Sequence, residues 1–149
     1  MRIAKPTLAW GLTLVVATAA FGQVDTSNAQ KKLLSKRAAE ADAYRKLAET
    51  IKGLQITSDT YVKDFVAESD TIQAQMDEFI RGVRLGEPTW YYDMSCEVPA
   101  EVTVAKIIQT LKAIHTRHYN GDRITGKDIE QIERRVDKKV ITVIGMWAP

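Results

Sequence analysis

The stretch from residue 28 to residue 62, NAQKKLLSKRAAEADAYRKLAETIKGLQITSDTYV, decides the fold class, because its hydrophobic period changes at Gly53. Before this glycine, apolar residues recur three or four positions apart, as they do on one face of an α-helix. These residues are Leu34, Ala38, Ala41, Tyr44 (or Arg45 in its place), Ala48 and Ile51. We therefore expect one amphipathic helix over residues 28–52, which Gly53 ends as a C-terminal cap.

After Gly53 the period shortens to two. In the segment LQITSDTYV, Leu54, Ile56 and Val62 lie on one side of an extended chain, with small polar residues between them. This alternation predicts a half-buried strand over residues 54–62. Phe65 and Val66 break the alternation, which indicates a bulge or the end of the strand.

A short helix is expected next, because Asp70 and Gln73 have the spacing of a capping box. It runs to about Ile80 and is ended by Gly82. The side chains expected to face inward are Ile72, Met76, Phe79 and Ile80.

The segment VRLGEPTWYYDMSCEV, residues 83–98, predicts two strands joined by a turn at Gly86-Glu87-Pro88. In the second strand, alternate residues point to opposite faces. One face is expected to carry Trp90, Tyr92, Met94, Cys96 and Val98, and the other Tyr91, Asp93, Ser95 and Glu97.

A second long helix is expected over residues 101–118, after Pro99. Its predicted inner stripe is Val104, Ile108, Leu111, His115 and His118, flanked by Ile107 and Ile114. Residues 124–137 keep helical spacing through Ile129, Ile132 and Val136, with a strand as the alternative. The last segment, KVITVIGMW, is apolar on both faces, which is typical of a central or doubly covered strand.

Together these segments predict an α+β fold, in which two long amphipathic helices pack on a small, mostly antiparallel sheet. Residues 28–149 are long enough to form a single domain with its own core.

The N-terminus has the organisation of a cleavable secretory signal peptide over residues 1–22. Arg2 and Lys5 precede the apolar run LAWGLTLVVATAAF, which is short for a membrane span and ends in small residues. We expect cleavage before Gln23, with an earlier site before Ala20 and an uncleaved anchor as the alternatives. The expected location is therefore periplasmic or secreted, with no transmembrane span after cleavage.

Charge and cysteine content restrict the function. Removing the signal takes Arg2 and Lys5 from the 21 basic residues and none of the 19 acidic ones, so the remaining domain is formally neutral. This balance gives no support for binding to nucleic acid or to an anionic membrane surface. The single cysteine, Cys96, allows neither an internal disulfide nor a metal site with several thiolates.

Three groups of residues could carry chemistry. The segment Gly121–Lys127 has the glycines and lysine of a phosphate-binding P-loop, but Asp128 stands where Ser or Thr would hold magnesium, so we expect a loop and helix cap. His115 and His118 share a helix face and could bind one metal, although packed histidines are expected. The third group is acidic and contains Asp59, Asp64, Glu68 and Asp70. It could form a calcium site or an acid–base pair, although we expect surface carboxylates and a helix cap.

Cys96 is in phase with the apolar residues of its strand, so we expect it to be a buried, unreactive thiol. No nucleophile, base and orienting acid occur together in a recognisable pattern. The sequence therefore predicts a protein that is not an enzyme and has no catalytic, cofactor-binding or metal-binding residues and no cofactor.

Two segments of the chain resemble the lipoprotein-20-like family. The first is AAEADAYRKLAETIKGLQI followed by TYVKDFVAESDTI, and the second is FIRGVR before a paired-strand segment that ends in CEVP. This family includes small outer-membrane lipoproteins and domains of flagellar basal-body-associated proteins. The resemblance covers residues 38–111 and implies a non-enzymatic α+β domain of the cell envelope, often in an oligomer. Gln23 stands where a lipoprotein would have its lipidated cysteine.

We therefore expect an exported structural or interaction protein of the envelope, self-associating or bound to other envelope proteins through a sheet edge or an exposed aromatic face. Association with the flagellum or the outer membrane is part of this expectation. The alternative is a periplasmic domain that binds a metal through the histidines, or a small molecule in a pocket near Trp90 and Tyr91.

Overall fold

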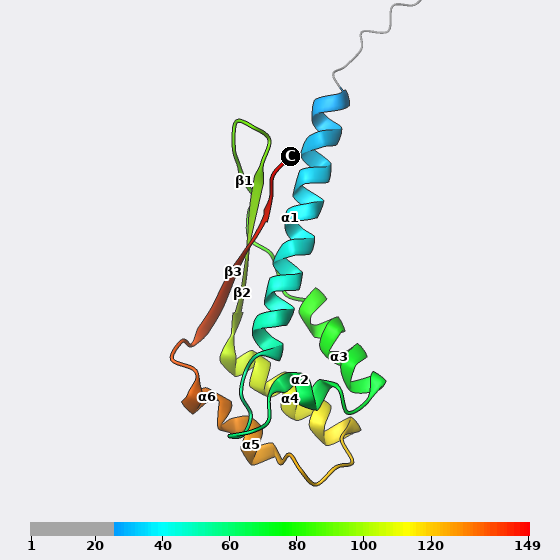
Figure 1. Cartoon of the computed structure of the whole chain (residues 1–149), viewed down its shortest axis with the longest axis vertical. Helices are drawn as coiled ribbons and strands as arrows, with labels where there is room; N and C mark the ends of the chain where they lie inside the picture. The colour runs from blue at the N-terminus through cyan, green and yellow to red at the C-terminus, as the bar shows by residue number, and fades with distance from the viewer. Residues whose placement is uncertain (1–25) are drawn as a thin grey trace, which may run out of the picture.

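The computed structural model describes residues 26–149, so the predicted signal peptide lies outside the described residues. Helices pack on a small antiparallel sheet, which confirms the α+β prediction (Figure 1). The elements are α1 (Thr26–Lys52), α2 (Val62–Val66), α3 (Asp70–Arg81), β1 (Thr89–Trp90), β2 (Cys96–Thr103), α4 (Val104–His118), α5 (Gly126–Glu130), α6 (Ile132–Arg135) and β3 (Val140–Trp147).

The sheet has the strand order β1-β2-β3, and α1 lies along β2 and β3 on one of its faces. The other helices gather at one end of the molecule, whereas the β1–β2 hairpin, the C-terminus and the start of α1 lie at the other end (Figure 1). None of the helices within residues 26–149 is long and apolar enough to cross a bilayer.

The helix α1 forms where it was predicted, but it turns a different stripe toward the sheet. Its fully buried residues follow one another at intervals of four: Ser35, Ala39, Ala43, Leu47 and Ile51. Of the predicted stripe, only Ile51 is fully buried, and Leu34 is 62% exposed. The reason is a very close contact with β3, where a Cβ atom on Gly145 would lie 2.7 Å from Ala43 Cα. Small side chains must therefore face the sheet, even though Leu34 is more hydrophobic.

The predicted strand over residues 54–62 is wrong. Residues 54–61 form a loop closed by one bridge, Gln55 with Tyr61, and α2 begins at Val62. Polar side chains bond within this loop, as in the hydrogen bond from Thr57 Oγ1 to Asp59 Oδ1 (2.8 Å), and such local bonds compete with strand pairing. The Asp64 carboxylate then accepts a hydrogen bond from the Tyr61 amide (2.7 Å) at the start of α2.

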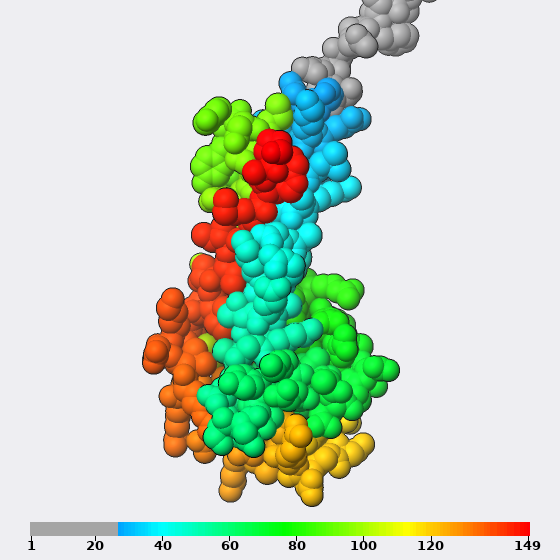
Figure 2. Space-filling view, in the orientation of Figure 1, coloured from blue at the N-terminus to red at the C-terminus, as the bar shows by residue number. Residues whose placement is uncertain are grey.

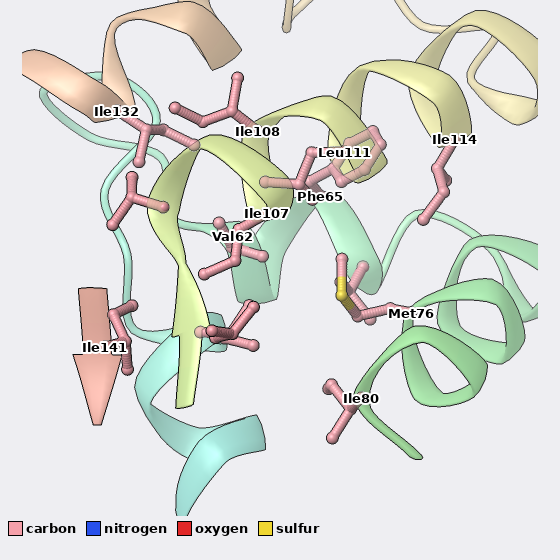
Figure 3. Close-up of a cluster of buried hydrophobic side chains, with 14 of the residues drawn as sticks. Val62, Phe65, Met76, Ile80, Ile107, Ile108, Leu111, Ile114, Ile132 and Ile141 are labelled. Atoms are coloured by element: carbon pink, nitrogen blue, oxygen red, sulfur yellow. The ribbon is translucent and has the colours of Figure 1, made fainter. Parts of the chain in front are cut away.

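The helix α2 turns three residues inward with helical spacing, Val62, Phe65 and Val66. They pack with residues of α3 and α4 in the main core, which Figure 3 shows. The break in alternation at Phe65 thus marks the change from loop to helix.

The helix α3 is confirmed, with Ile72, Met76 and Ile80 buried and Phe79 partly buried. Its N-cap is Ser69 instead of Asp70, because the Ser69 hydroxyl accepts a hydrogen bond from the Ile72 amide (3.2 Å).

The hairpin turn predicted at Gly86-Glu87-Pro88 is at the wrong place. Leu85 pairs with Ala100 and Trp90 with Cys96, so the predicted turn lies within one arm of the hairpin, and the chain reverses over residues 91–95. Met94 takes the positive φ of 66° in this turn. Tyr92 and Met94 therefore do not lie on the inner strand face, whereas Cys96 and Val98 do, as predicted.

The helix α4 begins at Val104, later than predicted, because residues up to Thr103 continue β2 and pair with β3. Thr103 is the N-cap and accepts a hydrogen bond from the Lys106 amide (3.3 Å). The apolar part of the predicted stripe is buried as expected: Val104, Ile107, Ile108, Leu111 and Ile114. The helical prediction for residues 124–137 is correct, and the strand alternative is wrong, because α5 and α6 lie there.

The prediction that β3 is central or covered on both faces is wrong. It is an edge strand, since β2 lies in the middle of the sheet. Ile141 and Gly145 face α1, whereas Val140, Ile144 and Met146 on the opposite face are 41%, 48% and 54% exposed. Continuous apolarity along β3 therefore does not reflect burial on both faces.

Candidate functional site

The segment that resembles a P-loop is a loop followed by a capped helix. Thr125 is the N-cap of α5, and its hydroxyl accepts a hydrogen bond from the Asp128 amide (3.3 Å). In return, the Asp128 carboxylate accepts from the Thr125 amide (2.8 Å) and hydroxyl (2.6 Å), and the hydroxyl bond in particular holds the Asp128 pKa below its usual range. A carboxylate already occupies the position that a phosphate would need.

The structure separates the roles of the two histidines. His115 Nε2 lies 2.7 Å from the Ile124 carbonyl oxygen, and its ring stacks on Tyr119 with 4.9 Å between the centroids. His118 instead lines an open groove between α3 and α4. Within residues 26–149, no group of three or more His, Cys, Asp or Glu side chains is placed to hold a metal ion.

The groove has a volume of about 450 Å³ and is lined by both polar and apolar side chains. Glu78 and Arg117 contribute opposite charges from the two helices, and Phe79 and Ile114 contribute apolar surface. Sequence reasoning missed this groove, because no periodicity within one helix shows which second helix lies beside it.

The four acidic residues Asp59, Asp64, Glu68 and Asp70 serve separate local contacts. The Thr57 hydroxyl hydrogen bond lowers the pKa of Asp59, and Asp64 bonds the Tyr61 amide. Glu68 pairs with Arg123 at 3.6 Å, and Asp70 lies in the first turn of α3. These contacts do not form a calcium site or an acid–base pair.

Cys96 is buried on the inner face of the sheet, where it clusters with Ala39 and Val98 against Trp90 and Trp147. Burial raises the pKa of its thiol, as expected for an unreactive cysteine. Trp90 is half-buried against this cluster. The neighbouring Tyr91 is exposed in the turn, and its pKa is raised by a hydrogen bond with Glu97.

Among the described residues, the outer face of the sheet exposes several apolar side chains. We call it the open face and define it by Val140, Ile144 and Met146 of β3 with Pro99 of β2. Pro99 lies opposite Ile144 in the strand register, and Thr142 separates Val140 from Ile144 along the same face. Apolar side chains concentrated on one face are typical of a protein–protein contact.

The free edge of β3 is occupied by side chains of α1. The Met146 amide donates to Asp42 Oδ2 (2.9 Å), and Lys46 Nζ donates to the Ile144 carbonyl oxygen (2.9 Å). Asp42 also pairs with Lys46 (2.9 Å) and Arg45 (2.6 Å). Because these side chains occupy the edge between Ile144 and Met146, a second strand cannot pair with that part of β3 without displacing them.

Asp42→Ala is expected to lower the free energy of unfolding by about 1–2 kcal/mol at neutral pH, through loss of a charged hydrogen bond at a partly solvated site. The Met146 amide, followed by Lys46, holds the folded-state pKa of Asp42 well below its usual range. A lowered folded-state pKa means that this stabilisation is present above the unfolded-state pKa of about 4 and is lost as the pH falls through the folded-state pKa.

Urea melts of parent and variant from neutral pH down to about pH 2 test this expectation. Their difference in unfolding free energy should shrink on acidification. The matched control is Asp122→Ala in the exposed loop after α4, which should change stability by less than about 0.5 kcal/mol. A difference that stays constant down to acid pH, or an equal loss in the control, would contradict the assigned role.

Comparison of the chain with protein-family models, with curated proteins and with solved structures finds no match.

Proposed function

We propose that this chain is an exported, non-enzymatic protein of the cell envelope that works by association, and that the open face binds a second copy of the chain. The observation that carries the proposal is the exposure of Val140, Ile144 and Met146 on the outer face of β3, which they share with the exposed Thr142. The residues between them, which face α1, are buried or half-buried.

A symmetric pair suits this surface. A two-fold axis near Pro99 and Ile144 would place Ile144 and Met146 of one copy against the same residues of the other, since isologous contacts use one patch twice. Covering the exposed half of each side chain contributes roughly 1 kcal/mol per residue. Glu97 and Glu101 lie on the same face of β2 and would form a polar rim.

The envelope location is supported by two features of the sequence. The predicted signal peptide directs the chain to the periplasm or outside the cell. The resemblance of residues 38–111 to the lipoprotein-20-like family supports a structural role, with association to the outer membrane or to the flagellum as its specific forms.

We expect light scattering over a range of concentrations to give the mass of a dimer or larger assembly for the parent. Ile144→Thr combined with Met146→Thr keeps β-forming residues on β3 but removes apolar surface, and it should weaken association at least about tenfold, from the loss of roughly 2 kcal/mol. Tyr61→Thr is the matched control, because it removes an exposed large side chain from the loop before α2, outside the open face. A parent that stays monomeric, or a double variant that associates as the parent does, would refute the dimer.

The groove between α3 and α4 favours a second candidate, a domain that binds a small polar molecule. Its volume is in the range of small-ligand sites, and Glu78 and Arg117 offer both charges. Light scattering and denaturant melts with and without zinc test whether the chain binds a metal through its histidines. A zinc-dependent gain in stability that His118→Ala removes would favour a metal-binding function over the interaction protein.

A further inference from the structure

One end of the molecule combines aromatic side chains with positive charge. We call it the aromatic end and define it by Trp90, Tyr91, Tyr92, Trp147 and residues 31–37 of α1. Trp90 and Trp147 lie on either side of Cys96 in the sheet register. Figures 1 and 2 show the hairpin, the end of β3 and the start of α1 together at this end.

The hairpin turn presents its tyrosines to solvent. Tyr92 is fully exposed and Tyr91 is exposed. Asp93 Oδ1 accepts hydrogen bonds from the Ser95 amide (2.9 Å) and hydroxyl (2.6 Å), which fix the turn beneath them. Tyrosine and tryptophan side chains, with one polar and one apolar part, are favoured at the level of lipid headgroups.

The adjoining part of α1 is strongly basic. Residues 26–39 contain Lys31, Lys32, Lys36 and Arg37 and no acidic residue. Lys32 Nζ lies 5.8 Å from the centre of the Trp90 ring, and Lys36 pairs with Glu40 (3.7 Å). No ion pair joins the other three basic side chains to an acidic residue within the described part of the chain. The formal neutrality of the whole domain thus conceals a local excess of positive charge.

Exposed apolar side chains occur among these basic residues. Leu33 and Leu34 remain at least half exposed on α1. Lysines, exposed leucines and a tyrosine-bearing turn at one end have the composition of a surface that contacts a bilayer.

We propose that the aromatic end binds the surface of an anionic lipid bilayer. Lys31, Lys32 and Arg37 would contact lipid phosphates, and Tyr91 and Tyr92 would enter the headgroup layer. This inference does not rest on self-association through the open face, because the measurement of lipid binding and the measurement of mass without lipid are separate.

The full chain is expressed, and the protein purified from it is sedimented with lipid vesicles. The anionic vesicles are phosphatidylethanolamine with about a third phosphatidylglycerol, and phosphatidylcholine vesicles serve as the comparison. Binding should prefer the anionic vesicles and weaken as salt rises from about 0.05 to about 0.5 M. Lys31→Gln with Lys32→Gln should weaken binding about 25-fold, since each lysine near an anionic surface contributes roughly a factor of five. Tyr91→Ser with Tyr92→Ser should also weaken it several-fold.

The opposite end supplies matched controls. Near α2, Lys63 Nζ lies 5.3 Å from the centre of the Tyr61 ring. This contact between a lysine and an aromatic ring is of the same kind as that between Lys32 and Trp90. Lys63→Gln with Lys127→Gln, and Tyr61→Ser alone, should leave vesicle binding within about twofold of the parent. Within residues 26–149 both tryptophans lie at the aromatic end, so their fluorescence emission should shift to shorter wavelength on anionic vesicles.

Two results would overturn the proposal. One is a failure of the variants to separate the two ends of the molecule: either the lysine or tyrosine variant binds anionic vesicles within twofold of the parent, or the control variants lose binding equally. The other is a parent that does not bind vesicles. In that second case, a change in the lipid-free mass of the lysine variant would identify the aromatic end as an interface between copies.

Discussion

Gly145→Ala is expected to lower the free energy of unfolding by at least about 3 kcal/mol, or to prevent folding. A Cβ atom at this position would lie 2.7 Å from Ala43 Cα and closer still to the Ala39 carbonyl oxygen and the Ala43 amide nitrogen. All three are backbone atoms of α1, so no side-chain rotation can relieve the overlap. The helix must move away from β3 and lose packing along its buried stripe.

Urea denaturation followed by circular dichroism measures this loss. The matched control is Gly126→Ala, because a Cβ atom there would meet no other atom within 4 Å, and it should be neutral or stabilise the domain by up to about 1 kcal/mol. Ala43→Gly added to Gly145→Ala should not restore stability, since it leaves the clashing backbone in place. Equal stability of Gly145→Ala and the parent would show that α1 does not lie this close to the sheet.

Phe65→Ala is expected to lower the free energy of unfolding by about 3–5 kcal/mol, the range for removing a buried phenylalanine. Phe65 is fully buried, and its ring centre lies 5.5 Å from that of Tyr119 and 6.2 Å from that of His115. The substitution therefore leaves a cavity between α2 and α4, in the core that Figure 3 shows.

Phe79→Ala provides a control with the same chemical change. Phe79 is only partly buried and lines the groove between α3 and α4, so its loss should be about half as large. The same urea melts compare the two variants. A smaller effect at Phe65 than at Phe79 would contradict the buried, helical assignment of Phe65 in α2.

The sequence alone determines the helices α1, α3 and α4 and the α+β class, because helical periodicity and helix ends are properties of neighbouring residues. Ile72, Met76 and Ile80 repeat with the helical period, and Gly82 follows the last of them. The inward orientation of Cys96 and Val98 is equally local, since side chains alternate along any strand. The loop and helix cap after Gly121 are local as well, because Asp128 stands where a phosphate-binding loop would have Ser or Thr.

The tertiary structure alone decides features that depend on residues distant in sequence. The buried face of α1 is set by Gly145, about a hundred positions after Ala39 and Ala43, because close backbone contact requires small residues and outweighs the hydrophobicity of Leu34. The hairpin turn is set by the pairing of Trp90 with Cys96, which outweighs the local turn preference of Gly86–Pro88.

Both proposed surfaces also depend on tertiary contacts. The open face exists because α1 covers only the other face of β2 and β3, a layer arrangement that the apolar sequence of β3 does not encode. The aromatic end exists because strand pairing places Trp90 and Trp147 on either side of Cys96, and packing against α1 brings Lys32 over the Trp90 ring. Local sequence fixes which way a side chain points along its own element, whereas the position of that element among the others depends on contacts between distant segments.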